Sequence, residues 1–169
     1  MVFQTLNTYI DYIEDGDLQR ITEVYNSNKR FLEAHIGKDY VDAKWVKNEI
    51  EEMKSIEFKS CKILSKDKNK IIGFLDFKVK ETSYLSLLML HSDFKGKEFG
   101  KEVYEGLEVY MRDNSSEAIR IDVVTGYNEK VTKFWLAQGF KIVDEIKLNW
   151  GDKELPAVVM KKNIGKGDL

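Results

Sequence analysis

Apolar residues recur at helical spacing in the first third of the chain. Between residues 17 and 32 they lie every three or four positions, and Asp17 can cap the first turn. This pattern predicts a helix that can break near residues 26–28. A second helix is predicted over residues 42–53, because its apolar residues share one face while Lys and Glu cover the other. Residues 2–6 fit either a short strand or the start of a helix.

The pattern changes to alternation in the middle of the chain. Residues 71–79 place apolar side chains or Gly at every second position, as a strand with one well-buried face does. Residues 58–64 are predicted to form the antiparallel partner, because the polar loop over residues 65–70 is short enough for a hairpin. Residues 84–90 are apolar almost throughout, which predicts a central strand covered on both faces.

This central strand begins a strand–loop–helix–strand unit. A Gly-containing loop leads into a predicted helix over residues 101–112, and a further strand is predicted over residues 119–123. A crossover of this length makes the two strands parallel and right-handed. The remaining predicted elements are a short helix after Asn128 that ends at Gly139, and a strand hairpin over residues 140–148 and 155–162. The order of elements predicts one α/β domain around a mixed sheet.

Composition excludes several classes of protein. The 169 residues are 43% hydrophobic and 33% charged, which fits one soluble globular domain and not a disordered chain. Lys and Arg number 27 and Asp and Glu 29, so the net charge of -2 supplies no positive field for nucleic acid. No apolar stretch approaches the ~20 residues of a membrane helix. We therefore expect neither a nucleic-acid nor a membrane partner.

The cysteine count and the N-terminus indicate a reducing compartment. Cys61 is the only cysteine and the chain has two His, so we expect no intramolecular disulfide, no zinc site and no other metal. Residues 1–17 lack the basic region, apolar run and cleavage site of a signal peptide. Both observations predict a cytoplasmic protein.

The first candidate chemistry lies in the loop over residues 94–101. A loop that enters a helix exposes unpaired backbone N–H groups, and the positive end of the helix dipole favours an anion there. Gly96 and Gly100 allow close backbone approach, and Lys95, Lys97 and Lys101 add positive charge. The loop fits a phosphate or pyrophosphate site, and it fits equally well a turn with solvated lysines.

Two segments favour the first interpretation by resemblance. HSDFKGKEFGKEVYEGL, from His91, and NEKVTKFWLAQGF, from Asn128, resemble the signature segments of the GNAT superfamily of N-acetyltransferases. The first family motif is Gln or Arg, two residues, Gly, one residue, then Gly or Ala at the start of a helix. The second is Asn followed by a helix that ends in aromatic-x-x-x-Gly-Phe. With the strand before them, the segments cover residues 84–140.

The resemblance implies a fold, a function and partners. The implied fold is a GNAT-like single domain over residues 1–169, of mixed α/β class. Its mostly antiparallel sheet has about six to seven strands with a central, splayed parallel pair, and about four helices flank it. The implied function is acetyl-CoA-dependent transfer of an acetyl group to a primary amine of a small molecule, peptide or protein. The implied partners are acetyl-CoA as acyl donor and an amine acceptor, with the chain a monomer or a homodimer.

The resemblance also places the donor. The backbone of the central strand pairs with the pantetheine arm as an added strand, the loop holds the pyrophosphate, and Asn128 hydrogen-bonds the pantetheine chain. The implied cofactor-binding residues are Leu88, Met89, Leu90, Lys95, Gly96, Lys97, Glu98, Phe99, Gly100, Lys101 and Asn128. Lys95 departs from the family's Gln or Arg, and Glu98 from its first Gly. The side chain of Glu98 must therefore point to solvent.

The usual acid and base of the family are both replaced. Trp135 stands where a Tyr often acts as general acid, and Val123 where some members carry a Glu base. An indole N–H donates a hydrogen bond but supplies no proton. The remaining mechanism is direct attack of a neutral amine on the thioester, with the backbone N–H of Met89 or Leu90 polarising the carbonyl. The candidate catalytic residues are Met89, Leu90, Trp135, Tyr84 and Glu81, and the candidate proton acceptors are Glu81, Tyr84, His91 and Asp122.

Two further functions remain open. The replaced acid and base also fit a GNAT-like domain that binds an acyl-CoA as a sensor or regulator without turnover. An unrelated α/β nucleotide-binding protein is disfavoured, because the chain has neither GxxxxGK[ST] nor a complete GxGxxG.

The resemblance also indicates where the acceptor binds. In the GNAT family the first two helices wall the acceptor site, so the acidic residues of segment 49–52 could attract a cationic amine. Phe31 and His35 could line that site or belong to the core, and Tyr127 could line the substrate channel.

Overall fold

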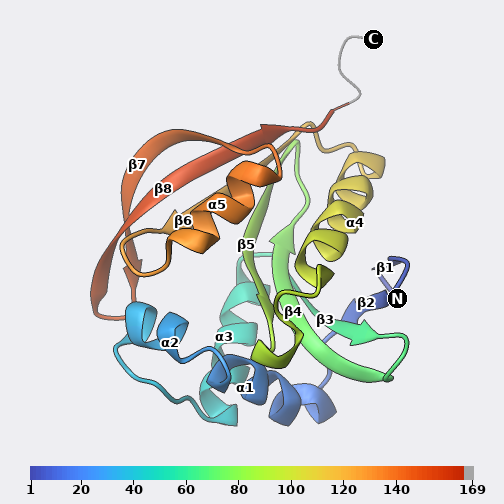
Figure 1. Ribbon diagram of the computed structural model, residues 1–169, viewed down its shortest axis with the longest axis vertical. Helices are drawn as coiled ribbons and strands as arrows, with labels where there is room; N and C mark the ends of the chain where they lie inside the picture. The colour runs from blue at the N-terminus through green and yellow to red at the C-terminus, as the bar shows by residue number, and fades with distance from the viewer. Residues whose placement is uncertain (166–169) are drawn as a thin grey trace.

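The computed structural model describes residues 1–165, in which an eight-stranded sheet forms the centre of the molecule (Figure 1). The strand order is β1-β2-β3-β4-β5-β6-β8-β7. The strands are β1 (Phe3–Gln4), β2 (Thr8–Tyr12), β3 (Lys59–Ser65), β4 (Lys70–Lys78), β5 (Thr82–Leu90), β6 (Ala118–Val124), β7 (Lys141–Trp150) and β8 (Lys153–Asn163). Neighbouring strands are antiparallel except β5 and β6. The last four residues of the expected domain lie outside the described residues.

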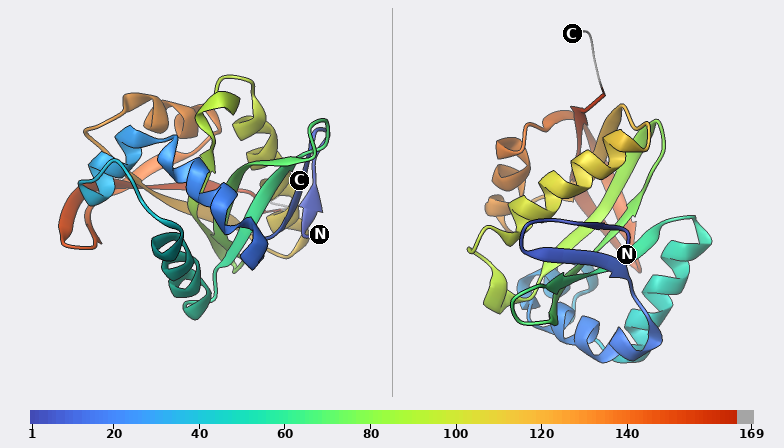
Figure 2. Two further views of the ribbon diagram at one scale, coloured as in Figure 1. Left: turned by 90° about the horizontal axis from the view of Figure 1, so that it is seen from below. Right: turned by 90° about the vertical axis from the view of Figure 1, so that its right-hand side faces the viewer.

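Helices cover both faces of the sheet. Within residues 1–165 they are α1 (Leu18–Asn26), α2 (Lys29–Ile36), α3 (Ala43–Ser55), α4 (Phe99–Asp113) and α5 (Glu129–Ala137), with 3-10 turns η1 (Asp15–Asp17) and η2 (Ser92–Phe94). α1, α2 and α3 pack on one face and α4 and α5 on the other, so an apolar core forms on each side (Figures 1 and 2). None of these helices has both the length and the apolar content needed to cross a bilayer.

The predicted fold class is confirmed, with more elements than expected. The sheet has eight strands because the N-terminal segment, for which strand and helix were both open, forms the edge hairpin β1–β2. In β2, Thr8 and Ile10 are buried while Tyr9 is exposed, so alternation is present but extends over only five residues. The helix predicted over residues 17–32 is two helices, α1 and α2, separated by Ser27 and Asn28.

The parallel pair β5–β6 opens after a short stretch. The two strands pair over only three residues each, Thr82–Tyr84 with Ala118–Arg120. Beyond this stretch the register between β5 and β4 shifts at Ser86, which is an extra residue on β5. Such a bulge bends its strand and increases the local twist, and β5 diverges from β6 here. The expected splay of the parallel pair is therefore present, and it leaves an open edge on each strand.

Gly73→Ala is expected to destabilise the protein. Gly73 on β4 lies opposite Leu90, and a Cβ there would come 2.3 Å from the backbone oxygen of Met89. Because this oxygen belongs to β5, the strand itself would have to move, and we expect a loss of about 1–3 kcal/mol in the free energy of unfolding. Urea denaturation measures this loss. Gly16→Ala is the control, since its Cβ would meet nothing within 4 Å, and equal midpoints for both variants would contradict the prediction.

Candidate active site

A cavity of about 970 Å³ lies where β5 and β6 separate. Its lining comes from both strands, the loop before α4, α5, α2 and the end of β7. This volume lies at the upper end of those that proteins use for small-molecule ligands. Within residues 1–165, no group of three His, Cys, Asp or Glu side chains is placed to hold a metal ion.

The end of β5 supplies a free strand edge to the cavity. After Tyr84, β5 pairs with β4 on one side and with no described strand on the other. Leu88, Met89 and Leu90 all line the cavity. Backbone N–H and C=O groups on such an edge can be satisfied by an extended ligand that adds as a strand. The structure thus brings together the three residues that were expected to meet the pantetheine arm.

The loop before α4 contains two residues in the left-handed region. Gly96 has a φ of 75° and Glu98 a φ of 65°. Glu98 directly precedes α4, and its side chain is exposed to solvent. A left-handed backbone costs a non-Gly residue about 1–2 kcal/mol, which explains why glycine suits this position better. Lys95, Gly96 and Gly100 bring the loop to the cavity wall.

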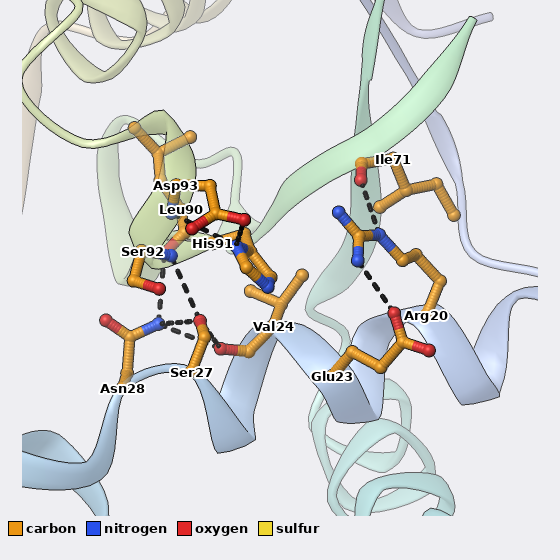
Figure 3. A network of polar contacts seen from close by, with 10 residues as sticks. All are labelled: Arg20, Glu23, Val24, Ser27, Asn28, Ile71, Leu90, His91, Ser92 and Asp93. Carbon is orange, nitrogen blue, oxygen red and sulfur yellow. Dashed lines mark hydrogen bonds and ion pairs between the residues drawn. The ribbon is translucent and has the colours of Figure 1, made fainter.

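Asn28 connects the α1–α2 break to β5 and the loop. Its buried side chain donates from Nδ2 to the backbone oxygen of Leu90 at 3.0 Å and accepts at Oδ1 from the ammonium of Lys95. Next to it, the hydroxyl oxygen of Ser27 accepts the backbone N–H of Ser92 at 3.0 Å (Figure 3). Partial burial lowers the pKa of Lys95. The sequence pattern indicated the helix break, but no local signal identifies Asn28 as the partner of a strand 62 positions away.

Asp122 lies in β6, two residues beyond the last parallel pair. It is the one carboxylate among the described residues that line the cavity. Its Oδ1 accepts from Nε of Arg120 at 2.9 Å, and its Oδ2 accepts from Nη2 of Arg120 at 3.1 Å and from the hydroxyl of Tyr84. Burial and the neighbouring carboxylate raise the pKa of Tyr84 well above its usual range, so this phenol is a hydrogen-bond donor at neutral pH.

Asn128 and Trp135 reach the cavity from α5. Asn128 caps the helix, because its Oδ1 accepts the backbone N–H of Lys130 at 3.1 Å. Its Nδ2 makes no hydrogen bond within residues 1–165, so this donor is free for a ligand. Trp135 is 8% exposed and packs edge-to-face against Tyr104 and Phe140, with ring centroids 5.5 Å apart in both pairs. Its indole is mainly part of the core and presents only a small surface to the cavity.

Several expected site residues lie away from the cavity. Glu81 is exposed just before β5, and its backbone oxygen accepts the N–H of Glu117 at 2.8 Å. The Nδ1 of His91 accepts the N–H of Asp93 at 3.1 Å, so this ring caps η2. Four residues of the loop instead border a separate hollow of about 450 Å³: Lys97, Glu98, Phe99 and Lys101. Because successive helical residues point about 100° apart, the residues on either side of Gly100 face away from the cavity that it lines.

The opened parallel pair and the loop at the start of α4 together define a class of protein, an α/β domain that holds an extended ligand with an anionic group. Residues 18–140, more than half of the chain, match the family model described as the Acetyltransferase (GNAT) family. The chain belongs to this family. No curated protein matches it.

Solved structures share the fold at low sequence identity. An acetyltransferase from Thermus thermophilus is 20% identical with a TM-score of 0.75, over 94% of this chain and 98% of that chain. A phosphinothricin acetyltransferase from Sinorhizobium meliloti, in complex with acetyl-CoA, is 14% identical with a TM-score of 0.70, over 96% and 91%. A spermidine N-acetyltransferase from Vibrio cholerae, in complex with CoA and spermine, is 12% identical with a TM-score of 0.72, over 94% and 96%. At these identities the similarity concerns the fold alone.

Proposed function

We propose that this chain is an acetyl-CoA-dependent N-acetyltransferase, formed by a single domain, that acetylates a primary amine. The observation that carries the proposal is the free edge of β5 at Leu88, Met89 and Leu90, within one cavity with the loop that enters α4. A pantetheine arm suits the edge, and a pyrophosphate suits the backbone N–H groups at the helix start. The buried, free thiol of Cys61 fits a location in the reducing cytoplasm.

The proposed reaction is direct transfer. The amine nitrogen attacks the thioester carbonyl, a C–N bond forms, the C–S bond breaks, and the electron pair leaves with the sulfur as a thiolate. The backbone N–H of Leu90 polarises the carbonyl, because the alternation of the ladder directs the N–H of Met89 to Phe74 of β4 and that of Leu90 to the open edge. Asp122 attracts the incoming ammonium and accepts its proton. As the C–N bond forms, the nitrogen loses a second proton, which reaches the thiolate through solvent, since a thiol with a pKa of roughly 8.5 leaves without a dedicated acid.

Gly100→Val tests the donor site. A Cβ at Gly100 would come 3.7 Å from Leu90 and 3.8 Å from Phe134, which is ordinary contact, so the fold should tolerate the change. The larger side chain would project into the cavity, and we expect calorimetry to show at least a tenfold weaker affinity for CoA. Gly16→Val is the matched control, because it lies outside the cavity with open space around it. Equal CoA affinity for the two variants would place the pyrophosphate elsewhere.

An acyl-CoA sensor without turnover is the second candidate. The observation that favours it is the position of Trp135, whose indole sits in the core at the place of the family's usual acid and cannot supply a proton. Release of free thiol from acetyl-CoA in the presence of amines distinguishes the two functions. CoA binding with no thiol release from any amine would favour the sensor.

A further inference from the structure

Four aromatic side chains from separate parts of the chain meet along one part of the cavity. They are Phe31 and His35 of α2, Tyr127 of the loop after β6, and Trp150 at the end of β7, and all four line the cavity. We name this cluster the aromatic wall. Figure 1 shows the elements that carry it, α2 and the β7–β8 hairpin, on the left of β5, with the start of α4 on the right. The elements that carry the wall therefore lie on the other side of β5 from the helix that the donor loop enters.

The aromatic wall is held by ring-to-ring contacts centred on His35. Its ring stacks on Phe31 with centroids 3.8 Å apart, and it meets Trp150 at 4.8 Å and Tyr127 at 5.4 Å edge-to-face. Phe31 also meets Trp150 edge-to-face at 5.9 Å. Aromatic rings prefer offset-stacked and edge-to-face arrangements of this kind. An aromatic group on a ligand can extend the same packing.

His35 contributes a neutral ring to the wall. It is 4% exposed, and its Nδ1 lies 2.8 Å from the backbone oxygen of Phe31, which requires the proton on Nδ1. Burial and the charge of Lys153 lower the pKa of His35. The ring is therefore uncharged at neutral pH, and within residues 1–165 its Nε2 has no hydrogen-bond partner. The wall therefore combines apolar ring surface with the free acceptor Nε2 of His35.

Charge around the cavity disfavours an acceptor with several amines. The cationic side chains of its lining are Lys29, Arg30, Lys95 and Lys130. Asp122 is the one described carboxylate of the lining, and its Oδ1, which accepts a single hydrogen bond from Arg120, leaves room for one ammonium. The acidic residues of segment 49–52, considered above as an attraction for a cationic amine, do not line the cavity. A second ammonium would meet cations and no free carboxylate.

We propose that the amine acceptor is a monoamine that carries an aromatic ring, which packs against the aromatic wall while the amine approaches Asp122. This inference rests on the proposed function and adds the substrate class. The apolar wall stabilises a ring through burial and edge-to-face contacts. The cationic side chains of the lining repel polyamines. The cavity therefore favours an aromatic monoamine both by attracting its ring and by excluding competing polyamines.

The test measures free-thiol release from acetyl-CoA with three amines: phenethylamine, n-butylamine and spermidine. We expect kcat/KM for phenethylamine to exceed that for spermidine at least tenfold. Trp150→Ala should raise KM for phenethylamine at least fivefold, with KM for n-butylamine and the affinity for CoA unchanged. Tyr40→Ala is the matched control, because Tyr40 is an aromatic residue that is 65% exposed and does not line the cavity. Phe31→Leu, which removes a ring but keeps apolar volume, gives a second variant should Trp150→Ala not fold.

The outcomes separate the inference from the proposed function. Turnover with spermidine equal to or above that with phenethylamine would overturn the aromatic acceptor and leave the N-acetyltransferase intact. Equal losses for phenethylamine and n-butylamine in both wall variants would also overturn it, because the wall would then lack selectivity for rings. CoA binding with no thiol release from any amine would instead overturn the proposed function, and the substrate class with it.

Discussion

The Asp76→Asn variant is expected to be more stable than the wild type at pH 8 by about 2–4 kcal/mol in the free energy of unfolding. Asp76 lies on β4 beneath α1 and α3 and is 7% exposed. Its Oδ1 accepts a hydrogen bond from the hydroxyl of Ser60 at 2.6 Å, and no cation pairs with it among the described residues. Burial, with a further contribution from Glu49, raises the pKa of Asp76 to about 7.

The direction of the effect follows from proton linkage. The native state holds its proton up to about pH 7, whereas the unfolded carboxyl ionises near its usual pKa of 3.8. The contribution of this carboxyl to the free energy of unfolding is therefore fully present below about pH 4 and is lost as the pH rises through 7. The difference between the unfolded pKa of 3.8 and the native pKa of about 7 corresponds to about 4 kcal/mol, which is an upper limit for the gain in the free energy of unfolding. Asparagine has the size of aspartate and can accept the same hydrogen bond from the Ser60 hydroxyl, but its side chain does not ionise.

Urea denaturation of the wild type and variant from pH 4 to pH 9 measures this difference. We expect near-equal stability at pH 4 and a gap that grows up to about pH 7 and then stays constant. Asp39→Asn is the control, since it makes the same substitution at an exposed position. A gap that is constant from pH 4 to pH 9 would mean that Asp76 ionises normally in the native state.

Periodicity predicted those elements whose burial pattern is local. The hairpin β3–β4 and the unit β5–α4–β6 could be located because their apolar residues alternate or recur over at least seven positions. β2 escaped detection, since its five residues are too few to distinguish a strand from a helix start. The break between α1 and α2 was indicated by Asn26, Ser27 and Asn28, residues that favour caps and turns.

The site was predictable only where it follows local motifs. The loop into α4 and the cap at Asn128 are each contained in a few consecutive residues, and two motifs at this spacing identified them. The bond from Asn28 to Leu90 and the contact of His35 with Trp150 join residues far apart in the chain. Such pairs depend on tertiary packing, and no periodicity or composition encodes them. Tertiary packing also explains why Glu81 was wrongly expected in the site: it directly precedes β5 in sequence, but it faces solvent away from the cavity.

Asp122→Asn is expected to lower kcat/KM for acetyl transfer about a hundredfold at pH 7, in line with the loss of a general base. An alkyl amine with a pKa near about 10.4 arrives as an ammonium at this pH and must lose a proton before it attacks. Asp122 is the described carboxylate of the cavity that can attract this ammonium and take its proton. The neutral variant would leave the Arg120 guanidinium without its partner beside the cavity, and its charge would repel the substrate.

The pH dependence distinguishes this chemical role from a structural one. At pH 9.5 a larger share of the amine is already neutral, so the deficit of Asp122→Asn should shrink to about tenfold. Tyr84→Phe removes only the hydroxyl that donates to Oδ2 of Asp122 and should cost less, about tenfold at pH 7. Calorimetry should show unchanged affinity for CoA in both variants, and thermal melts should confirm that each is folded. A deficit of equal size at pH 7 and pH 9.5 would show that Asp122 only holds Arg120 and Tyr84 in place, with the amine's proton leaving by another route.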